Sequence, residues 1–257
     1  MLIEKFERLF RSRVEVPLHL NKQNVILASF PKSGNTWYRF VSSNILAGYS
    51  GTENVDFNSI RYLSPEIRGN RSLEGIIKSE NAPTFLKTHF YNVSGFNKYP
   101  VVVLFREPVK TFQSYFDYMQ NEQGKSYKSF LSFLNSSRVG IDSWLYFHAT
   151  WMRREDVVFV SYDELIKNQF NGLKTVYKKL GFEIDNEVLE QAIKASSREN
   201  MARIEKESGD PSKKNAEYNF VGNKDGRHGQ IGGDLKNYIL SSTSAMYQKL
   251  MDRRLPL

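Results

Sequence analysis

The stretch from Val25 to Phe40 constrains the fold more than any other part of the sequence. It opens with an apolar run that ends at Ala28, turns at Pro31, and then carries apolar residues at helical spacing from Trp37 onward. This order predicts a buried strand, a tight turn and a helix. Free backbone N–H groups and the positive end of the helix dipole make such a helix start an anion site.

The turn itself carries groups that suit an anion. Lys32 adds a point charge, Ser33 and Thr36 add hydroxyl donors, and Gly34 lets the backbone approach a ligand closely. The loop lacks the G-x-x-x-x-G-K-[ST] pattern of Walker A. An ordinary strand, turn and helix with a capping serine is the alternative interpretation.

Composition bounds the remaining possibilities. The chain has 257 residues, 40% of them hydrophobic, which is enough for one sizeable core, and we predict one domain over residues 1–257. It has no cysteine and no run of ~20 apolar residues, so we expect a reducing, cytoplasmic location and no stable membrane insertion. The net charge of +8 leaves nucleic acid, an anionic membrane surface or a small polyanion as partners.

Polar side chains follow three further apolar runs that read as buried strands. Lys87, Thr88 and His89 end the first run, Arg106 follows the second, and Tyr162 ends the third. Polar groups at the carboxyl ends of parallel strands lie where open α/β sheets bind ligands. The strands are expected at 82–90, 101–105 and 156–162.

Helices should connect these strands and cover the sheet. Residues 1–23 read as a short amphipathic helix and a linker, and 205–226 as a polar loop that could be mobile. The other helices are expected at 35–47, 72–79, 108–119, within 125–153 on both sides of 135–140, at 169–180, 186–195 and 238–252.

The segment from Pro31 to Trp37 resembles the 5′-phosphosulfate-binding loop of the soluble, cytosolic-type sulfotransferases, in a short form like that of bacterial members. These enzymes use 3′-phosphoadenosine 5′-phosphosulfate (PAPS) as sulfuryl donor. The resemblance extends over residues 25–240 through several motifs in the family's order. It implies a single α/β domain with a central parallel sheet flanked by helices and a P-loop-kinase-like phosphosulfate-binding loop.

The same resemblance implies roles for individual residues. His89 would be the general base, Lys32 would stabilise the bridging oxygen, and Lys87 would support the sulfuryl oxygens or the departing charge. His148 would line the acceptor side, although a core histidine is an equally weighted alternative. The implied cofactor-binding residues are Lys32, Ser33, Gly34, Asn35, Thr36, Trp37, Arg106, Ser114, Tyr162, Ser196, Arg198, Met201, Arg227, His228 and Gly229.

Three positions depart from the family pattern, and one of them is Leu235, which lies where the family usually has a tryptophan. Arg198 stands where the family has a phenylalanine over the adenine, and a guanidinium can also stack on a purine. His228 replaces a lysine in the motif that closes over the 3′-phosphate.

The resemblance implies transfer of a sulfuryl group from PAPS to a hydroxyl or amine of a glycan, lipid or small molecule, with adenosine 3′,5′-bisphosphate (PAP) as product. It implies no metal and no nucleic-acid partner. A P-loop-type nucleotide or small-molecule kinase and a non-catalytic nucleic-acid-binding protein are the two alternatives. The acceptor and the oligomeric state are left open.

Overall fold

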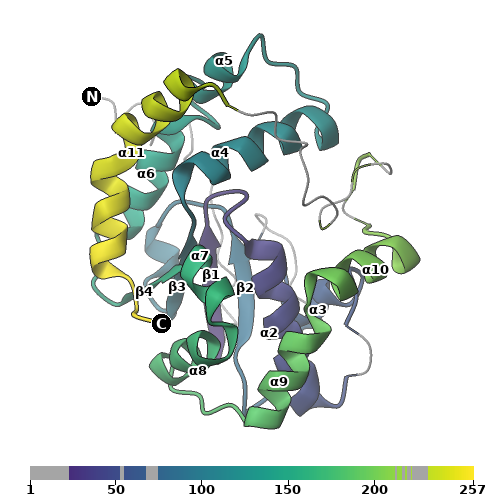
Figure 1. The fold of residues 1–257 in the computed structure, drawn as a ribbon. Helices are drawn as coiled ribbons and strands as arrows, with labels where there is room; N and C mark the ends of the chain where they lie inside the picture. The colour runs from purple at the N-terminus through teal and green to yellow at the C-terminus, as the bar shows by residue number, and fades with distance from the viewer. Residues whose placement is uncertain are drawn as a thin grey trace.

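A parallel four-stranded sheet forms the centre of the protein in the computed structural model, which describes residues 23–52, 55–67, 75–211, 213–215, 218, 221 and 231–257 (Figure 1). The strand order is β2-β1-β3-β4, so β1, the first strand among the described residues, lies inside the sheet. The strands are β1 (Asn24–Ser29), β2 (Thr84–Thr88), β3 (Val101–Phe105) and β4 (Val157–Ser161).

Successive side chains of a strand point to opposite sides of the sheet, and here the side chains on both sides are apolar. Helices therefore cover both faces (Figure 1). Val25 and Leu27 of β1 pack into one apolar cluster, whereas Ile26 and Ala28 pack into the other. The first face carries α2 (Asn35–Ser50), α8 (Gln169–Lys179), α9 (Asn186–Ala195) and α10 (Arg198–Ser208). The second carries α4 (Pro108–Asp117), α5 (Phe130–Leu134), α6 (Ile141–Trp151) and α11 (Gly233–Arg253).

Short elements complete the described structure. They are α3 (Ile60–Leu63), a 3₁₀ turn (Ser94–Phe96), a π-helical turn (Tyr118–Glu122) and α7 (Tyr162–Lys167). The π-helical turn directly continues α4, and π-turns occur frequently at functional sites.

The predicted α/β class, central parallel sheet and strand positions are confirmed, whereas several helix bounds were wrong. α2 continues through Gly48 to Ser50 and ends at its C-cap Gly51, whose φ is 67°; at Gly48 a Cβ would lie 3.0 Å from Val188 Cγ1 of α9. α10 continues to Ser208, past the predicted start of the loop at 205, and α11 begins at Gly233 rather than 238. Residues 75–79 of the predicted short helix are not helical, and 72–74 lie outside the described residues.

Candidate functional site

The turn between β1 and α2 leaves the start of that helix available to an anion. Gly34, the N-cap, has φ 97°, Lys32 has φ 67°, and no side chain caps the helix. Ser33 is fully buried, and its Oγ has no hydrogen-bond partner among the described residues. Because a buried hydroxyl without a partner is costly, this turn has the free donors that an anion would satisfy.

Tyr162 explains why residue 34 must be glycine. A Cβ on Gly34 would lie 2.1 Å from Cδ2 of the Tyr162 ring, so any larger residue displaces that ring. Trp37 meets the same ring edge-on with centroids 6.2 Å apart, and the Arg106 guanidinium lies 5.4 Å from its centroid. Residues that follow β1, β3 and β4 therefore lie together around this ring, at the carboxyl ends of the strands.

Arg106 follows β3 and has an incompletely satisfied guanidinium. Its Nε is buried and has no hydrogen-bond partner among the described residues. An unpaired guanidinium N–H in the interior is costly, and a phosphate group offers pairs of oxygens that can accept parallel N–H bonds from a guanidinium. Ser114 is half-buried on α4, which begins two residues after Arg106.

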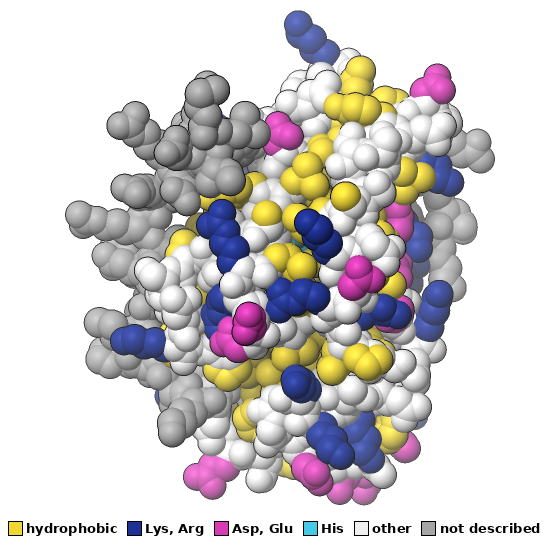
Figure 2. Space-filling view, turned by 90° about the vertical axis from the view of Figure 1, so that its left-hand side faces the viewer, with side chains coloured by type: hydrophobic (Ala, Val, Ile, Leu, Met, Phe, Trp, Pro, Cys, Tyr) yellow, Lys and Arg dark blue, Asp and Glu magenta, His cyan; other side chains and the backbone are white. Residues whose placement is uncertain are grey.

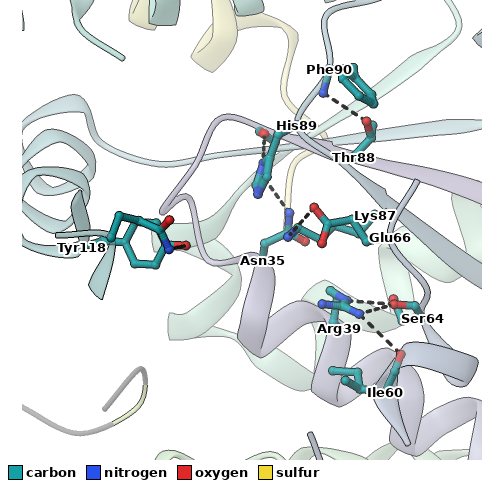
Figure 3. Close-up of polar contacts among 12 residues, drawn as sticks. Asn35, Arg39, Ile60, Ser64, Glu66, Lys87, Thr88, His89, Phe90 and Tyr118 are labelled. Atoms are coloured by element: carbon teal, nitrogen blue, oxygen red, sulfur yellow. Dashed lines mark hydrogen bonds and ion pairs between the residues drawn. The ribbon is translucent and has the colours of Figure 1, made fainter. Parts of the chain in front are cut away.

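His89 lies directly after β2 and contacts the end of β1 (Figure 3). Its Nδ1 lies 2.7 Å from the Ser29 carbonyl oxygen. Because a carbonyl only accepts hydrogen bonds, Nδ1 carries the proton and Nε2 keeps its lone pair. Burial, and then the charge of Lys87, lower the pKa of His89 to about 3. The imidazole is therefore neutral at neutral pH, the form that a general base requires.

Lys87, the fourth residue of β2, forms an ion pair that the sequence did not reveal. Its Nζ lies 3.2 Å from Oε1 of Glu66. Glu66 comes from a segment with an irregular sequence pattern, and only the tertiary structure brings it beside Lys87 and His89 (Figure 3).

Lys32 projects from the β1–α2 turn toward the π-helical turn. Its Nζ lies 4.9 Å from the centroid of the Tyr118 ring, a cation–π contact. Burial is the main reason that the pKa of Lys32 is lowered to about 8, while Asp117 raises it and Arg106 and Lys87 lower it. The ammonium is thus charged at pH 7 but incompletely solvated, a state that a bound anion would stabilise.

His148 lies in the interior on α6. It has no exposed surface, and its Nδ1 donates to the Trp144 carbonyl oxygen at 2.9 Å. Burial lowers the pKa of His148 to about 3, and its Nε2 has no partner among the described residues. This environment matches the core alternative more closely than an open acceptor site, and the acceptor role stays a prediction.

The α10 region contributes one exposed and two buried residues of the predicted set. Ser196 is fully buried and its Oγ accepts a hydrogen bond from Asn44 of α2, and Met201 is packed in the core. Arg198 is exposed, donates from Nε to the Val221 carbonyl oxygen at 3.2 Å, and lies close enough to Tyr162 to lower the pKa of that phenol. Desolvation, the larger effect, raises the Tyr162 pKa.

The predicted residues Arg227, His228 and Gly229 lie outside the described residues, as do residues 1–22 of the predicted N-terminal helix and linker. Within the described ranges, no three His, Cys, Asp or Glu side chains are grouped as metal ligands would be. No helix in the part of the chain that the structure describes has both the length and the apolar character of a membrane span.

Comparison with known proteins identifies a family for almost the whole chain. The family model described as "Sulfotransferase domain" matches residues 22–256. Sulfotransferase 6B1 of Mus musculus is 28% identical over 183 residues, covering 65% of this chain and 58% of that protein. Its Homo sapiens counterpart is 26% identical over 200 residues, covering 68% of this chain and 63% of that protein. The chain thus spans about three-fifths of the length of these relatives.

Solved structures share the fold at low sequence identity. Mouse sulfotransferase SULT7A1 complexed with PAP has a TM-score of 0.57 and 17% identity, covering 90% of this chain and 83% of that one. Retinol dehydratase in a complex with retinol and PAP has a TM-score of 0.61 and 14% identity, covering 93% and 82%.

Proposed function

The chain belongs to the sulfotransferase domain family, and we propose that it transfers the sulfuryl group of PAPS to an acceptor hydroxyl or amine. One observation carries this proposal. His89, neutral and with its Nε2 lone pair available, is hydrogen-bonded to Ser29, the last residue of β1 before the anion-binding turn. A proton acceptor and a phosphosulfate loop at the same sheet edge are the two parts that transfer to a hydroxyl requires.

The donor would be held from three directions. The N–H groups at the start of α2 and the Ser33 hydroxyl would bind the 5′-phosphosulfate. Arg106, with its unpartnered Nε, would bind the 3′-phosphate together with Ser114. Trp37 and Tyr162 would contact the adenine. The remaining proposed donor-site residues are Lys32, Gly34, Asn35, Thr36, Ser196, Arg198, Met201, Arg227, His228 and Gly229.

The transfer would proceed by in-line displacement. His89 Nε2 takes the acceptor proton while the acceptor oxygen or nitrogen forms its bond to sulfur. The bond between sulfur and the bridging oxygen breaks, and its electron pair leaves with the 5′-phosphate of PAP. Lys32 would stabilise the charge on that oxygen, and Lys87 the sulfuryl oxygens.

A small hydroxyl-bearing molecule is the acceptor class that we propose. Structures of retinol dehydratase that share this fold hold retinol or androsterone together with PAP. In this chain, aromatic rings lie close in sequence to His89 and the β1–α2 turn. The ring centroids of Tyr91 and Tyr146 are 4.6 Å apart, and those of Phe30 and Tyr115 are 5.6 Å apart. Such rings favour an acceptor with an apolar body.

Ligand titration separates this proposal from the two alternatives. Thermal unfolding is measured with PAP, with ATP and Mg²⁺, and with a single-stranded oligonucleotide. PAP at ~100 times its dissociation constant should stabilise the protein by about 2.7 kcal/mol, and the other two should not. Stabilisation by ATP and Mg²⁺ alone would favour a kinase.

Stabilisation by the oligonucleotide alone would favour a nucleic-acid binder. Such a protein should gather its cations into a stripe. On the face shown in Figure 2, Lys and Arg side chains are instead interspersed with acidic and apolar ones.

A further inference from the structure

Glu66 lies beside two residues of the proposed reaction, although it belongs to none of the motifs that identified them. Its Oε1 is 3.2 Å from Lys87 Nζ, and the two side chains are only 21% and 14% exposed. Ion pairs shielded in this way are screened less by water and salt than surface pairs are. Figure 3 shows Glu66, Lys87 and His89 at the same end of β2, next to Asn35 of α2.

The backbone around Glu66 is attached to the sheet. The Lys87 N–H donates to the Pro65 carbonyl oxygen, and the Ile67 N–H donates to the Lys87 carbonyl oxygen, both at 2.8 Å. Glu66 and Lys87 therefore form a parallel bridge at the outer edge of β2. These backbone bonds hold Glu66 opposite Lys87, within reach of the ion pair between the two side chains.

Arg39 of α2 holds the same segment from the other side. Its Nε donates to the Ser64 carbonyl oxygen at 2.9 Å, and its Nη2 to the Ile60 carbonyl oxygen at 3.4 Å (Figure 3). The Ser64 hydroxyl donates in turn to the Phe85 carbonyl oxygen of β2 at 2.8 Å. Arg39 lies one turn after Asn35, so the helix that starts at the anion-binding turn also anchors the Glu66 segment.

The charges in this group affect the proposed base. Besides burial, which dominates, the Lys87 ammonium lowers the pKa of His89, whereas Glu66 raises it. A carboxylate at this position therefore keeps a cation close to His89 at a smaller cost to the basicity of the imidazole.

We propose that Glu66 is a positioning residue for sulfuryl transfer: it holds the Lys87 ammonium beside His89, where the sulfuryl oxygens of the donor would lie. This inference rests on the proposed function, because Lys87 acts on the donor. Glu66 acts through Lys87 and does not touch the reacting atoms.

The first test detects the ion pair between Glu66 and Lys87 without requiring any enzymatic turnover. Competitive labelling with acetic anhydride, followed by mass spectrometry, measures how fast each lysine amine is acetylated. An ammonium held against a carboxylate is less available to the reagent, so Glu66→Gln should accelerate labelling of Lys87 severalfold. Glu164→Gln, which removes the carboxylate paired with Arg254 at 2.7 Å, is the matched control and should leave Lys87 labelling unchanged.

The second test is a double-mutant cycle on the conversion of PAPS to PAP with an acceptor. Misplacing a catalytic group can cost on the order of 10²-fold, so Glu66→Gln should lower kcat by roughly 10–100-fold while leaving the Kd for PAP within about twofold. In a Lys87→Met background, Glu66→Gln should lower kcat by less than about twofold, because the group through which it acts is gone. Glu66→Asp, which keeps a carboxylate, should restore part of kcat.

Three results would overturn the inference: unchanged Lys87 labelling in Glu66→Gln, unchanged kcat, or equal losses of kcat with and without Lys87. Parallel losses of Tm, PAP affinity and kcat would show that Glu66 only supports the fold. A wild-type chain that binds PAP but converts no PAPS would overturn the proposed function, and the labelling comparison would still decide whether Glu66 holds Lys87.

Discussion

Replacing Gly34 by alanine tests how the turn between β1 and α2 is built. The new Cβ would lie 2.1, 2.4 and 2.6 Å from three carbons of the Tyr162 ring. The backbone at φ 97° adds strain of roughly 1–2 kcal/mol for a residue with a Cβ. Overpacking adds about 1–3 kcal/mol, so the free energy of unfolding should fall by roughly 2–5 kcal/mol. For a chain of this size that loss corresponds to a fall in Tm of about 4–20 °C.

Gly51→Ala is the matched control, because Gly51 ends the same helix at φ 67° with nothing within 4 Å of the new Cβ. Its loss of stability should reflect the backbone strain at positive φ alone, without a clash between the new Cβ and a neighbouring side chain. Thermal unfolding of both variants, and of Gly34→Ala in a Tyr162→Ala background, separates the two contributions. The reasoning is refuted if Gly34→Ala costs no more stability than Gly51→Ala, or if removing the Tyr162 ring does not reduce its cost.

Three further outcomes follow from buried charges. Lys32→Met should raise the free energy of unfolding at pH 7 by about 1–3 kcal/mol, because a pKa lowered from 10.5 to about 8 means that the folded state disfavours the ammonium. Thermal unfolding should show this gain in stability shrinking between pH 8 and 10.5, and a gain independent of pH would contradict the reasoning. Glu122→Gln should cost about 1.5–3 kcal/mol in urea unfolding, because that carboxylate accepts the N–H groups of Lys214 at 2.6 Å and Asn215 at 3.1 Å; an unchanged midpoint would contradict it. Arg106→Ala should weaken binding of PAP strongly and of adenosine 5′-phosphate little in calorimetric titrations, and equal losses would assign Arg106 to the fold.

Local sequence patterns predicted the sheet because its strands are buried on both faces. A parallel strand of this kind is a short apolar run, as Val101–Phe105 shows, and the polar residue that follows must lie at the sheet edge. The apolar runs alone therefore place Lys87, His89 and Arg106 at the edge formed by the carboxyl ends of the strands. The turn after β1 was predicted from Pro31 and from the helical spacing of the apolar residues that begins at Trp37.

Contacts between distant segments could not be predicted in this way. Glu66 reaches Lys87 through a one-residue bridge, and Tyr162 lies over Gly34 although 128 positions separate them. Neither arrangement has a periodic pattern, because each depends on how separate elements pack. α10 was different: Ser197 caps it by accepting a hydrogen bond from the Asn200 N–H at 3.2 Å, and this local signal was present but missed.

Transfer of labelled sulfuryl groups from [³⁵S]PAPS tests the central claim most directly. A panel of small hydroxyl- and amine-bearing acceptors is incubated with the wild-type chain and with His89→Ala, and labelled product and PAP are both quantified. We predict that the wild type forms labelled product and PAP in equal amounts. His89→Ala should bind PAP with unchanged affinity but transfer ~10²–10⁴-fold more slowly. Transfer by His89→Ala within a few-fold of the wild-type rate, on an acceptor that the wild type uses, would contradict the account.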